Sequence, residues 1–298
     1  MPSTRAIRGR IRSVKNIAQI TKALQMVASS KMRRAQERVE QSRPYAEQLR
    51  ELVSRLARVT GEDIGNLALL KQRPIGNIGY VLITPDRGMS GALPSNINRK
   101  AAASALEQQK TLAEQGIQPG IQYIAVGRKG RDFIMRNQFH LAAEFTNYGD
   151  RPSLLDASAI AQVATEAFLK EEVDVVYLIY AKFINTVTQQ PTVVQLLPVQ
   201  PPTDEGRSSS ESIEYIYEPD AASIFEALLP RYVNVQVYQA LLEMLASFYS
   251  AQMVAMKNAT DNANDLIQDL TLTYNKARQA SITTQILEVV SGAGAEEG

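Results

Sequence analysis

The sequence has no cysteine and no tryptophan, and His140 is its only histidine. Without cysteine the chain can form no disulfide, thiolate metal site or thiol nucleophile. One histidine leaves almost no material for a histidine-based triad or a multi-histidine metal site. His140 follows Phe139, and we interpret it as structural, with a functional role as the less favoured alternative. We therefore expect no catalytic residue, no metal site and no cofactor.

Long apolar runs are also missing. No stretch approaches the roughly 18 to 20 apolar residues of a membrane-spanning helix. The basic N-terminus has neither the apolar core nor the cleavage site of a secretory signal. A P-loop motif, GxxxxGK[ST], is absent, which excludes that kind of phosphate site. The content of 45% hydrophobic and 21% charged residues is typical of a folded globular protein.

Acidic residues are scarce at the N-terminus. The whole chain has a net charge of +1, but its first fifty residues contain twelve Lys and Arg and only three Glu, a net charge of about +9. Such a segment attracts phosphates, anionic lipid or acidic protein loops, unless it is simply a solvated face. Nucleic-acid binding is disfavoured because no aromatic residue precedes Tyr45 and no known binding module is present.

Proline and glycine are rare at both ends of the chain. Between Ser3 and Val59 only Gly9 and Pro44 occur, and we expect a helix with a kink or break at Pro44. Its apolar stripe has nearly coiled-coil spacing. The stripe consists of Ile7, Ile11, Val14, Ile17, Ile20, Leu24 and Val27.

The C-terminal segment predicts an unusually long helix. No proline follows Pro230 and no glycine occurs before Gly292, which allows about 60 helical residues, or roughly 90 Å. Its expected stripe runs from Leu245 through Leu266 to Leu287 and includes several alanines. Two long striped helices at the two ends of one chain favour an antiparallel coiled coil.

The middle of the chain alternates strand and helix patterns, which indicates a mostly parallel sheet covered by helices. The fold class is therefore α/β, with a Rossmann-like domain inserted into a long coiled coil of the N- and C-terminal helices. We expect the N-terminal helix in residues 1–65, the α/β domain in 70–205 and the C-terminal helix in 210–298. The expected strands are 78–86, 121–127, 173–183 and 192–199, the last pairing back; the expected helices are 96–116 and 156–170; and 200–212 is a polar loop.

One glycine-containing loop in this domain is a candidate ligand site. The segment TPDRGMSGA, residues 84–92, follows an expected strand, where open α/β sheets often bind ligands. Two spaced glycines are also explained by an ordinary turn between strand and helix. An α/β nucleotide-binding protein and a basic coiled-coil scaffold therefore remain alternatives.

Four segments carry a resemblance to the gamma subunits of F-type ATP synthases, in the same order along the whole chain. The two terminal ones are the most specific. The segments are IRGRIRSVKNIAQITKALQMVASSKMRRAQ (7–36), TPDRGMSGAL (84–93), YEPDAASIFEALLPRYVNVQVYQALLE (217–243) and MVAMKNATDNANDLIQDLTLTYNKARQASIT (253–283).

The resemblance implies a non-catalytic rotor shaft that couples proton flow to ATP synthesis or hydrolysis. Its implied partners are the alpha and beta subunits of the catalytic hexamer, the epsilon subunit and the membrane ring of c subunits. The implied location is peripheral, at the cytoplasmic face of the bacterial plasma membrane. The expected contacts with the catalytic subunits are Arg278, Gln279, Lys31, Arg33, Arg34 and Arg38, and those with the membrane ring are Tyr217 and Glu218.

The sequence departs from the family pattern at several polar positions. Phe248 and Gln252 stand where the family usually has Glu and Arg, and Gln285 replaces an acid. In the glycine loop, Ala92 and Pro94 replace the common Gly and Asn. Some of the family's polar contacts are therefore expected to be absent or replaced here.

Overall fold

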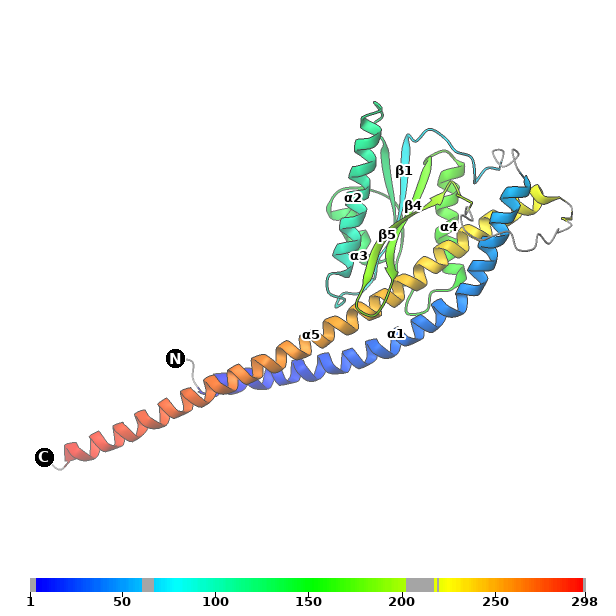
Figure 1. Cartoon of the computed structure of the whole chain (residues 1–298). Coiled ribbons are helices and arrows are strands. Elements are labelled where there is room, and N and C mark those ends of the chain that lie inside the picture. Colours follow the sequence, from blue (N-terminus) through cyan, green and yellow to red (C-terminus); the bar gives the residue numbers. More distant parts are fainter. Residues whose placement is uncertain (1–3, 61–66, 202–216, 219, 297–298) are drawn as a thin grey trace. The chain divides into compact units, whose positions relative to one another are not determined.

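The computed structural model describes residues 4–60, 67–201, 217–218 and 220–296 (Figure 1). Helices and strands alternate through the middle of the chain, and a long helix lies at each end. The elements are α1 (Thr4–Thr60), β1 (Asn77–Ile83), α2 (Leu93–Ala113), β2 (Gly120–Val126), α3 (Arg128–Arg136), β3 (His140–Phe145), α4 (Leu154–Leu169), β4 (Val175–Phe183), β5 (Gln189–Leu197) and α5 (Ala221–Glu296).

The chain forms two compact units. One comprises residues 1–29 and 252–298, and the other comprises residues 30–251. This division cuts both long helices, whereas the sequence analysis assigns each whole helix to a single segment. The polar loop expected at 200–212 lies outside the described residues from position 202 onward.

The larger unit contains a five-stranded sheet with the order β3-β2-β1-β4-β5. Strands β1, β2, β3 and β4 are parallel, and β5 pairs antiparallel with β4. The predicted mostly parallel sheet and its final returning strand are thus confirmed. The sequence analysis did not identify α3 and β3, because α3 has only nine residues and alternate residues of β3 are exposed.

The core of this unit is built on both faces of the sheet, with α2 and α4 flanking it in Figure 1. On the α2 face, Tyr80 stacks between Tyr123 and Tyr177, with ring centroids 5.4 and 5.7 Å away. Helix α4 begins with a capping box in which Ser153 and Asp156 satisfy each other's backbone N–H groups. Helix α4 therefore begins at Leu154, two residues before the expected position 156.

In the smaller unit the first part of α1 pairs with the last part of α5. The hydroxyl oxygens of Thr21 and Thr260 lie 2.7 Å apart, and Arg8 donates to the hydroxyl of Tyr274 at 2.5 Å. As the position in α1 decreases, the partner position in α5 increases, so the two helices run antiparallel. The predicted pairing of the terminal helices is confirmed.

The predicted seam of α1 was wrong by one residue over part of its length. Ile17, Ile20 and Val27 are more than half exposed, whereas Ala18 and Ala28 are buried. The buried stripe keeps strict steps of three and four through small side chains, and the larger apolar residues lie beside it. On α5 the same effect leaves Leu266 exposed; the positions protected there are Thr260, Ala263, Ile267, Leu270, Tyr274 and Ala277.

Both long helices tolerate proline. Of the kink or break expected at Pro44, the break does not occur, because helix α1 continues through this residue. Helix α5 begins nine residues before Pro230, at Ala221, rather than after it. Asp220 caps this start by accepting hydrogen bonds from the N–H and hydroxyl of Ser223. Among the described residues, no helix is long and apolar enough to span a membrane.

Candidate functional site

Asp150, in the loop after β3, connects the sheet to both long helices within the larger unit. Its carboxylate accepts a hydrogen bond from Lys31 Nζ of α1 at 2.5 Å and another from the hydroxyl of Tyr249 of α5. Its backbone carbonyl accepts from Arg38 Nη1 at 3.0 Å. Lys31 Nζ also lies 5.4 Å from the centre of the Tyr249 ring, within cation–π range. We call Asp150, Lys31, Arg38 and Tyr249 the Asp150 joint.

The joint favours the charged form of its carboxyl group. Partial burial opposes ionisation, but the hydrogen bonds from Lys31 and Tyr249 and the charges of Lys31 and Arg87 outweigh it, so the pKa of Asp150 lies below its ordinary value. Burial and the bond to Asp150 raise the pKa of Tyr249. At neutral pH the joint therefore holds an ionised carboxylate between an ammonium group and a neutral phenol.

The four basic residues predicted to contact catalytic subunits fall into two kinds. Lys31 and Arg38 bond to Asp150, whereas Arg33 and Arg34 lie exposed on α1. The Arg33 side chain is 83% exposed and pairs with Glu37 at 3.3 Å on its own helix. Among the described residues, Arg34 donates only to Ser30, one turn earlier on α1. Arg33 and Arg34 are thus the members of the set that an external partner can reach.

The other predicted contact residues flank the packed part of α5. Arg278 and Gln279 are exposed, immediately after the half-buried Ala277. No described side chain from Arg278 to Leu287 is protected, so this part of α5 has left its partner helix. Tyr217 is half-buried and Glu218 is exposed, just before α5 begins. The expected contacts of these four residues with the catalytic subunits and the membrane ring stay predictions.

The carboxyl edge of the sheet was the other candidate site. At the start of α3, side chains and carbonyl groups of the chain itself occupy the backbone N–H groups of this edge. Asp86 accepts hydrogen bonds from the backbone N–H groups of Arg128 and Asn147, both at 3.0 Å. The N–H groups of Lys129 and Gly130 bond to Pro85 and Thr84. The first amides of α3, which in such folds can bind a phosphate, are therefore already paired.

The start of α2 offers little more to a phosphate. Leu93 N–H is bonded to the carbonyl of Ser90, and Pro94 has no N–H to donate. The departure at Pro94 thus removes a backbone donor from the glycine loop. Among the described residues, no group of three or more His, Cys, Asp or Glu side chains is placed to hold a metal ion.

Close packing at this edge depends on Gly127. Its φ is +94°, and a Cβ there would lie 1.9 Å from the carbonyl oxygen of Thr84. Only glycine adopts this backbone at this distance. The tight approach brings the ends of β1 and β2 together, so that Asp86 reaches the start of α3.

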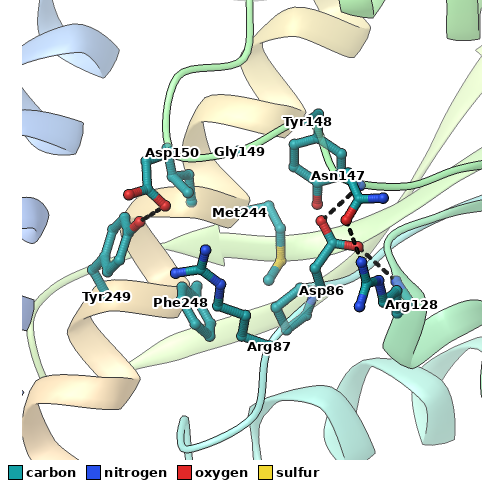
Figure 2. A pocket seen from close by; sticks show the side chains of 12 residues that line it. Asp86, Arg87, Arg128, Asn147, Tyr148, Gly149, Asp150, Met244, Phe248 and Tyr249 are labelled. Carbon is teal, nitrogen blue, oxygen red and sulfur yellow. Dashed lines mark hydrogen bonds between the residues drawn. The ribbon is translucent and has the colours of Figure 1, made fainter.

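A cavity of about 410 Å³ lies between this edge and the α5 segment 244–249 (Figure 2). Asp86, Arg128 and Asn147 line one side, and Asp150 and Tyr249 line the other. Both acids that organise the region, Asp86 and Asp150, were missed by the sequence analysis. The available signal for Asp86 was its position in the loop after an expected strand, where polar side chains of an α/β sheet gather. Asp150 follows β3, which was not predicted, so the sequence offered no such signal for it.

Comparisons with known proteins agree over nearly the whole chain. The family model described as ATP synthase matches residues 3–295. The "ATP synthase gamma chain" of Roseiflexus castenholzii is 47% identical over 99% of both chains, and that of Chloroflexus aurantiacus is 46% identical over 99% of both.

Solved structures show the same fold. The Tetrahymena thermophila mitochondrial ATP synthase central stalk and c-ring structure contains a chain 26% identical to this one, with a TM-score of 0.57 over 80% of this chain and 99% of that one. A chain of the Euglena gracilis mitochondrial ATP synthase, 20% identical, gives a TM-score of 0.66 over 98% of this chain and 94% of that one. The chain therefore belongs to the family of ATP synthase gamma chains.

Proposed function

We propose that this chain is the non-catalytic central rotor stalk of a bacterial F-type ATP synthase. It couples proton flow through a membrane ring of c subunits to ATP synthesis or hydrolysis in the beta subunits. The observation that carries the proposal is the segment of α5 after Ala277, where side chains from Arg278 to Leu287 are exposed beyond the paired region. A helical segment with apolar and basic side chains that no described part of the chain covers is suited to insertion into another subunit assembly.

The arrangement of charge supports repeated, weak contacts with the catalytic hexamer of alpha and beta subunits. Arg33 and Arg34 are exposed, and in the part of the chain that the structure describes their bonds stay within α1. Acidic loops that pass such a surface in turn are attracted without a deep energy minimum at any one angle, because exposed ion pairs contribute little each. Arg278 and Gln279 supply further polar contacts at the helix end.

The larger unit contains a direct path for torque from the sheet to the helices. We propose that the c-ring and the epsilon subunit bind the foot of the stalk, with Tyr217 and Glu218 near the ring. Force applied to the sheet reaches α1 and α5 through the Asp150 joint, whose hydrogen bonds resist sliding of the loop along either helix. The complex is then peripheral to the cytoplasmic face of the plasma membrane through its ring.

The paired amides at the start of α3 and the Pro94 position weigh against the nucleotide-binding alternative. The decisive experiment is affinity purification of the tagged chain from its own cells, followed by ATPase assays. We expect two larger nucleotide-binding subunits to co-purify, and the isolated chain to hydrolyse no ATP. Robust hydrolysis by the chain alone, or failure to recover those subunits, would overturn the proposal.

A further inference from the structure

The cavity beside the Asp150 joint has the size of a small-molecule site. Its volume of about 410 Å³ falls within the roughly 300–1,000 Å³ of ligand pockets. It lies where ligands of open α/β sheets usually bind, outside the carboxyl ends of β1 and β2. Here α5 closes that edge, so an occupant would touch both the sheet and the long helix.

Arg87 is the group in this cavity that lacks a hydrogen-bonding partner. Figure 2 shows its side chain reaching across the cavity toward Asp150 and Tyr249. Within the described part of the chain, its guanidinium group makes no hydrogen bond or ion pair. Each oxygen of Asp150 already accepts one hydrogen bond, from Lys31 or from Tyr249, and the exposed Arg87 acts on this carboxylate through its charge alone.

The charge around Arg87 is in surplus. The charges of Lys31, Arg34 and Arg87 all act on the Asp150–Tyr249 pair, against the single carboxylate of Asp150. On the opposite wall, two backbone N–H groups bind Asp86, and Arg128 donates to the side-chain oxygen of Asn147. One added negative charge at Arg87 would bring the region closer to neutrality.

The remaining wall is apolar. Met244, Leu245 and Phe248 of α5 line the cavity together with Pro85, and the three α5 side chains are almost fully buried. An inorganic ion would leave this surface unused, whereas a ring or short chain would cover it. A polyanion is disfavoured, because Asp86 and Asp150 stand on facing sides of the cavity.

We propose that this cavity binds a small organic anion, whose single carboxylate or phosphate head pairs with Arg87 and whose apolar body packs on Met244 and Phe248. The ligand would bridge the end of β1 to α5 and so reinforce the connection made by the Asp150 joint. This site goes beyond the coupling role and does not depend on it.

The test uses the chain assembled with its partner subunits and measures the difference between parent and variants by titration calorimetry. The probes are 2-naphthoate, 2-naphthyl phosphate and the neutral 2-naphthalenemethanol. Arg87→Met removes the charge and keeps the bulk, and we expect it to weaken binding of the anions about tenfold or more. The neutral probe should bind the parent about tenfold or more weakly than the better anion, and that anion identifies the preferred head group.

A second variant replaces the anionic head of the ligand with a carboxylate of the chain itself. Phe248→Glu places a carboxylate on the cavity wall facing Arg87, and it should abolish binding of the anions. Arg136→Met is the matched control, because Arg136 is an exposed arginine at the end of α3 that does not line the cavity. It should leave binding unchanged.

Three outcomes would overturn the proposal: equal affinity for the neutral probe, anion binding that survives Arg87→Met, or no binding of either anion to the parent at millimolar concentration. If Phe248→Glu prevents assembly, the exposed Arg87 still allows the charge test. Recovery of the partner subunits is measured separately in every preparation. Failure of the proposed coupling function is therefore distinguishable from failure of the proposed anion site.

Discussion

Replacing Asp150 with asparagine tests whether the Asp150 joint stabilises the fold. The change keeps the side-chain shape and an oxygen for Tyr249, but it removes the charge that faces Lys31 at 2.5 Å. Hydrogen bonds to charged groups contribute about 1.5–3 kcal/mol. Because the side chains of Lys31 and Asp150 are 27% and 42% exposed, solvent screening reduces this, and we expect a loss of about 1–2 kcal/mol.

The assay is urea unfolding of the full chain followed by circular dichroism, with a double-mutant cycle that adds Lys31→Met. The two changes should be strongly non-additive, because each removes the same pair. Glu166→Gln is the matched control, since Glu166 forms an exposed i,i+4 pair with Lys170 at 3.8 Å. It should change the free energy of unfolding by less than about 0.5 kcal/mol. Additive effects of the two joint substitutions would refute the reasoning.

The pH dependence gives an independent check on the same pair. The pKa of Asp150 in the folded chain lies below its ordinary value of 3.8, so the unfolded chain binds the proton more readily. The stabilisation is therefore fully present above pH 3.8 and is lost as the pH falls through the lower, folded-state pKa. The difference between parent and Asp150→Asn should be constant from pH 7 to pH 5 and shrink near pH 3. A difference that grows in acid would contradict the structure.

Three further predictions concern the exposed contact residues. Replacing Arg278 and Gln279 together with alanine should lower ATP-driven proton pumping in membrane vesicles about tenfold. The helicity of the chain, measured by circular dichroism, should not change, because both side chains are exposed. Unchanged pumping would remove their coupling role. Glu218→Lys should lower the ratio of pumping to ATP hydrolysis while soluble hydrolysis persists, and an equal ratio in parent and variant would count against a contact with the ring. Replacing Arg33 and Arg34 together with glutamate should damage coupled turnover severely, whereas either single alanine change should cost only a few tenths of a kcal/mol; a single alanine variant that abolishes coupling would indicate a specific latch instead.

Local sequence patterns were sufficient for the longer elements, but not for the short α3 and β3 or for the exact faces of the long helices. The Val- and Ile-rich strands and the two long helices were predictable because their patterns are local and long. The seam of α1 was misplaced at Ile17 and Ile20 because large apolar residues define a hydrophobic stripe most strongly. The helices instead pack through the smaller Ala18 and Thr21. Small side chains allow backbones to approach, which a scale of hydrophobicity does not record.

The polar joint was beyond the reach of pattern analysis. Lys31 and Asp150 are separated by 119 positions, and neither neighbourhood indicates the other. The N-terminal helix contains few acidic residues, and this scarcity suggested that its Lys and Arg side chains pair only with an external partner. Acidic residues elsewhere in the chain were not considered. Arg33 and Arg34 are exposed and have contacts on their own helix, and their external partners stay a prediction, while Lys31 and Arg38 bond to a loop that only the tertiary fold brings near.

The carboxylate of Asp86 has a consequence for how this domain behaves in a cell whose energy state changes. This carboxylate is covalently part of the chain, so its effective concentration at the start of α3 is fixed. A free phosphate compound therefore competes poorly with it for the same N–H group. The start of α3 in the sheet domain therefore stays occupied by the chain's own carboxylate, whatever the nucleotide concentration around it.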